Sequence, residues 1–257
     1  MTYCIGLKLE EGLVLMSDTR TNAGLDNVSR FTKMSTWEVG GERAVALLTA
    51  GNLSITQGVI TRLKHAITDA EEGRTNDDGS EIETLLNAPS MFRVAQIVGE
   101  TMRDVQERHR KTLEEQGAAA DATVLVAGQR NGGQHRLFLI YSAGNFIEAS
   151  YDTPFFQLGE HKYGKPILDR IITPETPISV ALKAAFVSMD STIRSNLTVG
   201  LPLDLAIIRT GQFKIDLKRR IEQEDPDFQR ISNEWSDALR NAFESLPEVT
   251  TDGASRG

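Results

Sequence analysis

The order of strand-like and helical patterns constrains the fold of this chain more than any other feature of its sequence. Short runs rich in apolar and β-branched residues predict strands at Tyr3–Leu9, Leu13–Ser17, Arg43–Thr49, Ala122–Ala127, Arg136–Tyr141, Phe146–Ala149, Asp204–Arg209 and Phe213–Leu217. Longer runs with apolar residues at helical spacing predict helices at Ile55–Ala70, Glu81–Glu115 (broken or kinked early by Pro89), Tyr163–Ile172, Ile178–Arg194 and Asp227–Leu246. Strands, two helices, strands, two helices and strands predict an α+β protein. In it two sheets face each other and a helix pair covers each outer side.

One domain is the organisation that length and composition favour. With 257 residues, 40% hydrophobic and 25% charged, the chain is long enough to bury one large core. The sequence has no internal repeat and no low-complexity block that would divide it. We therefore expect a single domain over residues 2–248 and a disordered tail at 249–257.

The charge and the cysteine content exclude several classes of partner. A formal net charge of −8 disfavours a nucleic-acid backbone or an anionic membrane as the main partner. The one cysteine, Cys4, excludes internal disulfides and fits a reducing compartment. The sequence contains no signal-peptide pattern and no run of the ~20 apolar residues needed to span a bilayer. We expect a cytoplasmic protein.

The second residue is a candidate nucleophile. If Met1 is removed, as the small side chain of Thr2 would permit, Thr2 carries both a hydroxyl and a free α-amine. An α-amine has an unperturbed pKa of ~7.7–8.0, so it can be neutral near physiological pH and accept the hydroxyl proton directly or through water. Thr2 would then combine nucleophile and base in one residue.

Three further residues could support this chemistry. Asp18 ends the second predicted strand, and a hairpin returns that strand to the level where the first began, so Asp18 should lie close to Thr2. Lys33 follows after a short connecting segment, and Asp18 could hold its ammonium in place. An ammonium near Thr2 would lower the pKa of the α-amine and of the hydroxyl. Gly51, between a predicted strand and a helix, could donate its N–H to an oxyanion, an interaction worth ~3–4 kcal/mol in a transition state.

Each of these residues also has an ordinary structural role available. Thr2 could begin an edge strand, Asp18 could belong to a turn, Lys33 could be solvated, and Gly51 could mark a helix entry. Residue types and spacing alone favour these ordinary roles, because single Thr, Asp, Lys and Gly residues are common in all proteins. Additional information is needed to choose between the two interpretations.

Longer sequence motifs supply that information. T-Y-C-I-G-L at residues 2–7, G-L-V-L-M-S-D-T-R-T-N-A-G at 12–24, K-M at 33–34 and L-L-T-A-G-N at 47–52 resemble the start of a proteasome β-subunit. With G-E-H-K-Y-G-K-P-I-L-D-R at 159–170 and S-N-L-T-V-G-L-P-L-D-L at 195–205, the chain is most similar to the bacterial Anbu group, proposed ancestors of the β-subunit. The resemblance covers about residues 2–218, and the D-T-R-T-N-A-G block is its most specific part.

The resemblance implies a fold and an activity. The fold is the four-layer αββα sandwich of the Ntn hydrolases, and the activity is that of a threonine peptidase acting on peptides or unfolded proteins, without a cofactor, in a ring or ring-like homo-oligomer. Carried over residue by residue, Thr2 is the nucleophile, Asp18 and Lys33 are its charged supports, and Gly51 is the oxyanion donor. The substrate-contacting positions are Thr21, Asn22 and Thr49, with Asn22 pairing a peptide backbone as an added strand.

The chain departs from the proteasome pattern around the terminal amine. Proteasome β-subunits usually have a serine where this chain has Glu160, and an aspartate and a serine where it has Ser195 and Thr198. By position, Ser195 and Thr198 belong to the catalytic group. Ser195 lacks the negative charge with which an aspartate would hold the α-amine of Thr2. The carboxylate of Glu160 could supply a negative charge from another part of the chain.

The remaining signals are ordinary. His65, His109, His135 and His161 lie far apart without metal-ligand spacing, so we expect no metal site. Cys4 should share a face of its strand with Thr2 and act as a small buried hydrophobe. Nucleotide-binding glycine motifs are lacking. Two alternatives to a general peptidase stay open: an amidase or acyl-transfer enzyme with a dedicated substrate, and a non-catalytic assembly subunit.

Overall fold

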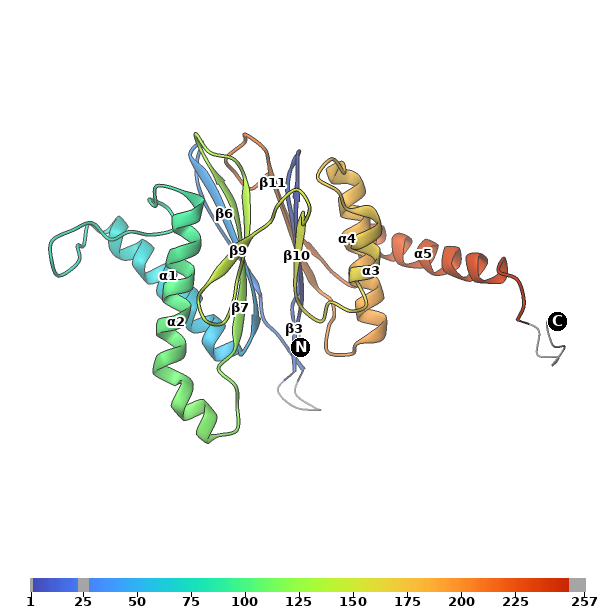
Figure 1. Ribbon diagram of the computed structural model, residues 1–257, viewed down its shortest axis with the longest axis horizontal. Helices are drawn as coiled ribbons and strands as arrows, with labels where there is room; N and C mark the ends of the chain where they lie inside the picture. The colour runs from blue at the N-terminus through green and yellow to red at the C-terminus, as the bar shows by residue number, and fades with distance from the viewer. Residues whose placement is uncertain (1, 23–27, 250–257) are drawn as a thin grey trace, which may run out of the picture.

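Two five-stranded antiparallel sheets lie face to face at the centre of the computed structural model, which describes residues 2–22 and 28–249 (Figure 1). The first sheet has the strand order β10-β1-β2-β11-β12, with bounds Phe155–Gly159, Tyr3–Leu9, Gly12–Asp18, Leu203–Arg209 and Leu217–Ile221. The second has the order β5-β6-β7-β8-β9, with bounds Met34–Val39, Arg43–Gly51, Ala122–Arg130, Arg136–Ile140 and Phe146–Glu148. A short separate pair joins β3 (Arg20–Asn22) to β4 (Val28–Arg30).

Helices form the two outer layers. The pair α1 (Leu53–Glu71) and α2 (Met91–Glu115) covers the second sheet, and the pair α3 (Lys165–Ile171) and α4 (Ile178–Ser195) covers the first (Figure 1). The last helix, α5 (Pro226–Glu244), touches α4 near its start and then runs away from the sandwich (Figure 1). The expected four-layer αββα arrangement is confirmed.

The core explains why these layers hold together. Along β6, Val45 and Leu47 pack toward the α1/α2 layer, whereas Ala46 and Leu48 pack between the sheets. Side chains of a strand alternate between its faces, so a strand covered on both sides is apolar at nearly every position. At ~25 cal/mol per Å² of apolar surface removed from water, such strands are a main source of stability.

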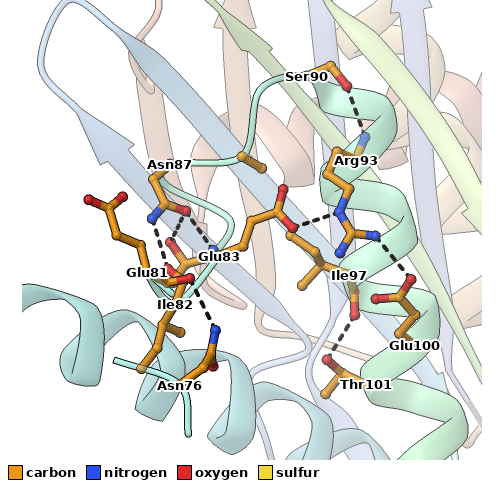
Figure 2. A network of polar contacts seen from close by, with 12 residues as sticks. Asn76, Glu81, Ile82, Glu83, Asn87, Ser90, Arg93, Ile97, Glu100 and Thr101 are labelled. Carbon is orange, nitrogen blue, oxygen red and sulfur yellow. Dashed lines mark hydrogen bonds and ion pairs between the residues drawn. The ribbon is translucent and has the colours of Figure 1, made fainter. Parts of the chain in front are cut away.

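The helix expected over Glu81–Glu115 begins only at Met91, so this prediction was wrong over its first ten residues. Pro89 lacks the N–H that a helix interior requires, and the Ser90 hydroxyl caps the new start by accepting from the Arg93 N–H at 3.1 Å (Figure 2). Side chains hold the preceding segment as a loop: Asn87 Nδ2 donates to the carbonyl of Ile82 at 2.9 Å.

Ion pairs fasten this loop to the helix that follows. The Arg93 guanidinium donates to Glu83 at 2.8 Å and to Glu100, seven residues later on α2, at 3.0 Å. Figure 2 shows the two carboxylates on either side of the guanidinium. Asn76 Nδ2 also donates to the carbonyl of Glu81 at 3.2 Å, which connects the loop to the segment after α1.

Four strands, β3, β4, β5 and β10, were not predicted, and one was misplaced. The strands β5 and β10 lie at the edges of their sheets, where half-exposed residues weaken the apolar alternation. The last strand, expected at Phe213–Leu217, runs over Leu217–Ile221 because the turn before it is longer and contains Phe213 at a φ of 52°. The expected hairpin over β7 and β8 is confirmed. The tail at 250–257 lies outside the described residues, so the domain boundary near residue 248 stays a prediction.

Candidate active site

The β1/β2 hairpin brings Asp18 to the start of the chain. In this antiparallel pair Cys4 lies opposite Ser17, so the next residue of β2 is level with the beginning of β1. There the Tyr3 N–H donates to Asp18 Oδ1 at 3.0 Å, which fixes the carboxylate one residue from Thr2. The expected proximity of Asp18 to Thr2 follows from hairpin geometry and is observed.

The Lys33 ammonium binds the same carboxylate oxygen. Its Nζ lies 2.6 Å from Asp18 Oδ1 and also donates to the carbonyl of Arg20 at 2.7 Å. Because an ammonium has three N–H donors, one remains for a group in front of it. Lys33 is 6% exposed and Asp18 is fully buried, so the pair is largely removed from water. Lys33 is thus held in a fixed position rather than solvated.

Burial and hydrogen bonding act in opposite directions on Asp18. Burial raises the pKa of the Asp18 carboxyl above its usual value, and the Lys33 ammonium opposes that rise. Backbone donors oppose it as well, since the N–H groups of Tyr3 and Gly200 point at the two carboxylate oxygens, at 3.0 and 3.4 Å. A buried carboxylate with one cation and two N–H donors is a well-satisfied anchor.

Strand β10 positions the backbone of Thr2 from the other side. The Glu160 N–H donates to the Thr2 carbonyl at 2.8 Å, next to the pairing of Tyr3 with Gly159. Gly159 has a φ of +76°, and a Cβ there would lie 1.8 Å from the Thr2 carbonyl oxygen. A side chain at this position would therefore displace Thr2, so glycine is required by the close approach of the two strands.

A cavity of about 1100 Å³ opens beside Thr2. Its lining includes five of the residues predicted for the site, which are Thr2, Thr21, Lys33, Thr49 and Gly51. The wall continues along α1 from Leu53 to Lys64 and along β5. Strands far apart in the sequence thus bring the predicted nucleophile, cation and glycine to one hollow.

Gly51 and Thr49 come to this cavity from the end of β6. Gly51 has a φ of +109°, and a Cβ there would lie 2.3 Å from the carbonyl oxygen of Asp121, the residue just before the neighbouring strand β7. Thr49 is buried, and its N–H donates to the carbonyl of Lys33 at 2.9 Å. This bond joins the strand that carries Gly51 to the segment that carries Lys33.

The two predicted substrate contacts after β2 lie in the short strand pair. Thr21 is half-buried and lines the cavity, opposite Ser29 in the β3/β4 pair. Asn22 follows it and lies opposite Val28. The predicted role of Asn22 in binding a peptide backbone stays a prediction.

The predicted catalytic residues Ser195 and Thr198 are not among the described residues that line the cavity. Ser195 is exposed at the last position of α4. The Asn196 side chain, between them in the sequence, reaches Glu160. Its Nδ2 donates to Glu160 at 3.1 Å, and its Oδ1 accepts from the Thr198 hydroxyl at 2.6 Å.

Asn196 is therefore the functional candidate that the sequence did not reveal. A series of hydrogen bonds runs from Thr198 through Asn196 to the Glu160 side chain, and the Glu160 backbone N–H then donates to the Thr2 carbonyl. Asparagine directly after a helix is an ordinary C-terminal cap, so residue type gave no signal. Its link to Glu160 spans 36 residues and depends on tertiary structure.

Tyr3 and Cys4, the two residues directly after Thr2, are buried. Cys4 is fully buried between the sheets, as expected, and its Sγ donates to the carbonyl of Thr49 at 3.8 Å. The Tyr3 hydroxyl contacts Ser188 Oγ at 2.7 Å, and burial raises the pKa of Tyr3 to about 12.

Within residues 2–22 and 28–249, no group of three or more His, Cys, Asp or Glu side chains is placed to hold a metal ion. None of the helices described could cross a membrane, being too short or too polar.

A four-layer sandwich with Thr2 at the start of a central strand and an Asp–Lys pair beneath it defines the class of proteasome β-subunit-like Ntn proteins. Solved structures place the chain within that class. It is similar to Anbu from Hyphomicrobium sp. strain MC1, in a Gly-1 mutant, with 43% identity, coverage of 98% of this chain and 100% of that one, and a TM-score of 0.86.

Two further structures agree. Anbu (ancestral β-subunit) from Yersinia bercovieri is 41% identical over 97% of this chain and 99% of that one, with a TM-score of 0.85. Anbu from Pseudomonas aeruginosa, solved as a helical assembly, is 42% identical over 97% and 98%, with a TM-score of 0.87. No protein-family model and no curated protein sequence matches the chain. The chain belongs to the Anbu family.

Proposed function

We propose that this chain is an N-terminal threonine peptidase, with Thr2 as nucleophile once Met1 has been removed. The observation that carries the proposal is the shared carboxylate: Asp18 Oδ1 accepts from both the Tyr3 N–H and Lys33 Nζ, at 3.0 and 2.6 Å. This contact couples a buried cation to the backbone of the residue next to Thr2. Lys33 also lines the cavity together with Thr2, which supports a role in binding or chemistry beyond that of a structural ion pair.

The proposed chemistry is acyl transfer in two steps. The Thr2 hydroxyl oxygen attacks the peptide carbonyl and its proton passes to the α-amine, while the Gly51 N–H donates to the resulting oxyanion. The carbon–nitrogen bond then breaks, and the α-ammonium returns the proton to the departing amine. A water molecule, deprotonated by the same amine, hydrolyses the threonine ester. The Lys33 ammonium, held in place by Asp18, provides the positive charge that lowers the pKa of the α-amine and of the hydroxyl in this mechanism.

The test begins with the intact mass of the purified protein, because a retained Met1 leaves no α-amine on Thr2. With Met1 removed, a broad fluorogenic peptide library should be cleaved, and Thr2→Ala should reduce the rate to background. Thr2→Ser, which keeps a hydroxyl and an α-amine, should retain measurable activity. Equal activity in the parent and in Thr2→Ala would exclude the mechanism, and a mature chain that retains Met1 would favour a non-catalytic assembly subunit.

Glu160 favours a second candidate, an amidase or acyl-transfer enzyme with a dedicated substrate. Its carboxylate accepts from Asn196 Nδ2 at 3.1 Å, and its own backbone N–H donates to the Thr2 carbonyl at 2.8 Å, so Glu160 is a neighbour of the proposed nucleophile. A carboxylate there would bind the amine differently from the serine that proteasome β-subunits usually have. Mass spectrometry of the products of a mixed peptide and small-amide library distinguishes the candidates: a general peptidase gives many cleavage products, a dedicated enzyme one or few.

We also place the catalytic unit in a homo-oligomer. A relative with 42% identity has been solved as a helical assembly. In this chain α5 extends away from the sandwich and exposes large apolar side chains, with Leu239 50% and Phe243 76% exposed (Figure 1). Exposed apolar stripes of this kind are typical of protein–protein contacts, so α5 is the proposed contact with another copy of the chain.

A further inference from the structure

The charged side chains that line the cavity beside Thr2 all have the same sign. They are Lys33, Lys64 and Lys218, and the described lining contains no carboxylate. The chain as a whole has a formal net charge of −8, so a purely cationic hollow runs against its average surface. A cleft with one sign of charge focuses the local field and raises the concentration of ligands of opposite sign.

Two of these lysines are free to meet a ligand. Lys33 is neutralised by Asp18 at 2.6 Å and is buried, whereas Lys64 and Lys218 are exposed. Neither Lys64 nor Lys218 forms an ion pair within residues 2–22 and 28–249. Lys218 is held toward the cavity wall by a bond from its Nζ to Thr36 Oγ1 at 2.9 Å.

Lys64 and Lys218 come from opposite halves of the sandwich. Lys64 is on α1, the helix that covers the second sheet, and Lys218 is on β12, the edge strand of the first sheet. Their presence in one lining means that a ligand in the cavity meets a cation from each half of the sandwich. A single helix face with a solvated lysine would not produce this arrangement.

The other polar groups of the lining suit the same ligand. Most of them are hydroxyls, contributed by Thr21, Thr32, Ser35, Thr36, Thr56 and Thr61. A hydroxyl donates a hydrogen bond to a carboxylate and an ammonium adds charge, so together they match an acidic side chain. For a Lys or Arg side chain of a substrate, the described part of the lining offers like-charge repulsion and no carboxylate acceptor.

We propose that this cleft selects peptides with Asp or Glu side chains near the bond to be cleaved, and that Lys64 and Lys218 determine this selectivity. The inference rests on the proposed peptidase function for its role in catalysis. The binding preference itself follows from the cavity and is measurable without turnover. Both lysines act on substrate binding and neither takes part in the chemical step.

The experiment separates binding from cleavage with one peptide series. The peptides share a sequence and differ at single positions on either side of the central bond, where Glu, Gln or Lys is placed. Binding is measured by fluorescence anisotropy on the full-length Thr2→Ala protein, and turnover on the parent with Met1 removed. We expect Glu peptides to bind more tightly than Gln peptides and Lys peptides most weakly, with the difference shrinking as salt is raised.

Variants assign the preference to the two lysines. Each of Lys64→Gln and Lys218→Gln should reduce the Glu-over-Gln preference by about two- to five-fold, the range expected for one solvent-exposed charge pair. Lys64→Glu combined with Lys218→Glu should reverse it in favour of Lys peptides. The matched control is Lys183→Gln, an exposed lysine on α4 with the same change in net charge, which should leave the preference unaltered.

Each outcome is decisive for one of the two proposals. Equal binding of the Glu, Gln and Lys peptides, or an acidic preference that survives in the double Glu variant, overturns the selectivity proposal even if the parent cleaves all of them. Preferred binding of Glu peptides with no cleavage of any peptide supports the selectivity proposal and contradicts the peptidase function. Preferred binding together with preferred cleavage supports both.

Discussion

At the residue scale, the Asp18–Lys33 pair is the structural centre of the site. Both partners are buried, and the carboxylate also receives two backbone N–H groups. Removing one member of a buried pair leaves an uncompensated charge, which is costlier than removing both. The pair is therefore sensitive to single changes in a way that a surface ion pair is not.

Lys33→Ala should lower the stability of the fold by about 3–5 kcal/mol, because Asp18 would remain buried without its cation. The double variant Asp18→Asn with Lys33→Met should be more stable than the single variant, since both charges are gone. Thermal unfolding of the two variants measures this difference. We expect neither variant to cleave peptides. A surface control, Lys183→Ala, should unfold like the parent.

Equal destabilisation in the single and double variants would contradict a buried pair. Recovery of peptide cleavage in the double variant would show that the cation has no part in catalysis. The two readouts together thus separate the structural from the chemical role of Lys33.

At the element scale, the contact between β1 and β10 positions Thr2. The two strands pair from Tyr3 with Gly159 to Leu7 with Phe155, and the Glu160 N–H extends the ladder to the Thr2 carbonyl. Strand β10 was missing from the sequence-based prediction because it is short and lies at a sheet edge. An edge strand with alternate half-exposed residues has a weak apolar signal.

Gly159→Ala should reduce peptidase activity more than it reduces stability. A Cβ at this position would lie 1.8 Å from the Thr2 carbonyl oxygen, so the start of β1 must move. The left-handed backbone conformation of residue 159 adds a cost of roughly 1–3 kcal/mol for a residue other than glycine. Peptide-cleavage kinetics and thermal unfolding measure the two effects.

Gly133→Ala is the matched control, because the nearest atom to a Cβ there lies at an ordinary 3.5 Å and its φ is not in the left-handed region. It should preserve both stability and activity. If Gly159→Ala kept the parent's rate, the β10 contact would not be what positions Thr2.

At the scale of the whole molecule, two features of the chain point outward. The cavity beside Thr2 is lined by elements of both sheets. Helix α5 extends outward from the α3/α4 layer (Figure 1). Along α5 Phe228 is buried against Phe186 of α4, while the later apolar side chains Leu239 and Phe243 are exposed. The helix thus begins as part of the core and ends without a covering partner in a single copy.

Leu239→Glu combined with Phe243→Glu should weaken the proposed homo-oligomer and leave the fold of each copy intact. Both side chains are at least half exposed, so their loss removes little packing within one chain. Sedimentation velocity should show a shift to smaller species, while circular dichroism stays unchanged. The control is Asn233→Glu with Asn241→Glu, two exposed polar positions on the same helix with the same added charge. Unchanged sedimentation of the apolar pair variant would exclude this helix as the contact.

Local patterns along the chain are enough to predict the layers and most of the site. Helical and strand periodicities are local properties, so they predict the αββα order, and the hairpin after Leu9 predicts that Asp18 lies beside Thr2. Family motifs added the predicted substrate contacts Thr21, Asn22 and Thr49, and the structure brings Thr2, Thr21, Lys33, Thr49 and Gly51 to one cavity.

Tertiary packing sets the features that depend on register and on distant elements. It placed Asn196, rather than Ser195, against Glu160, because the end of α4 sets which side chain faces β10 and no local pattern encodes that rotation. It also joined Lys64 of α1 and Lys218 of β12 in one cavity wall. Long-range neighbours of this kind arise from how the sheets pack, and the composition of each segment leaves them open.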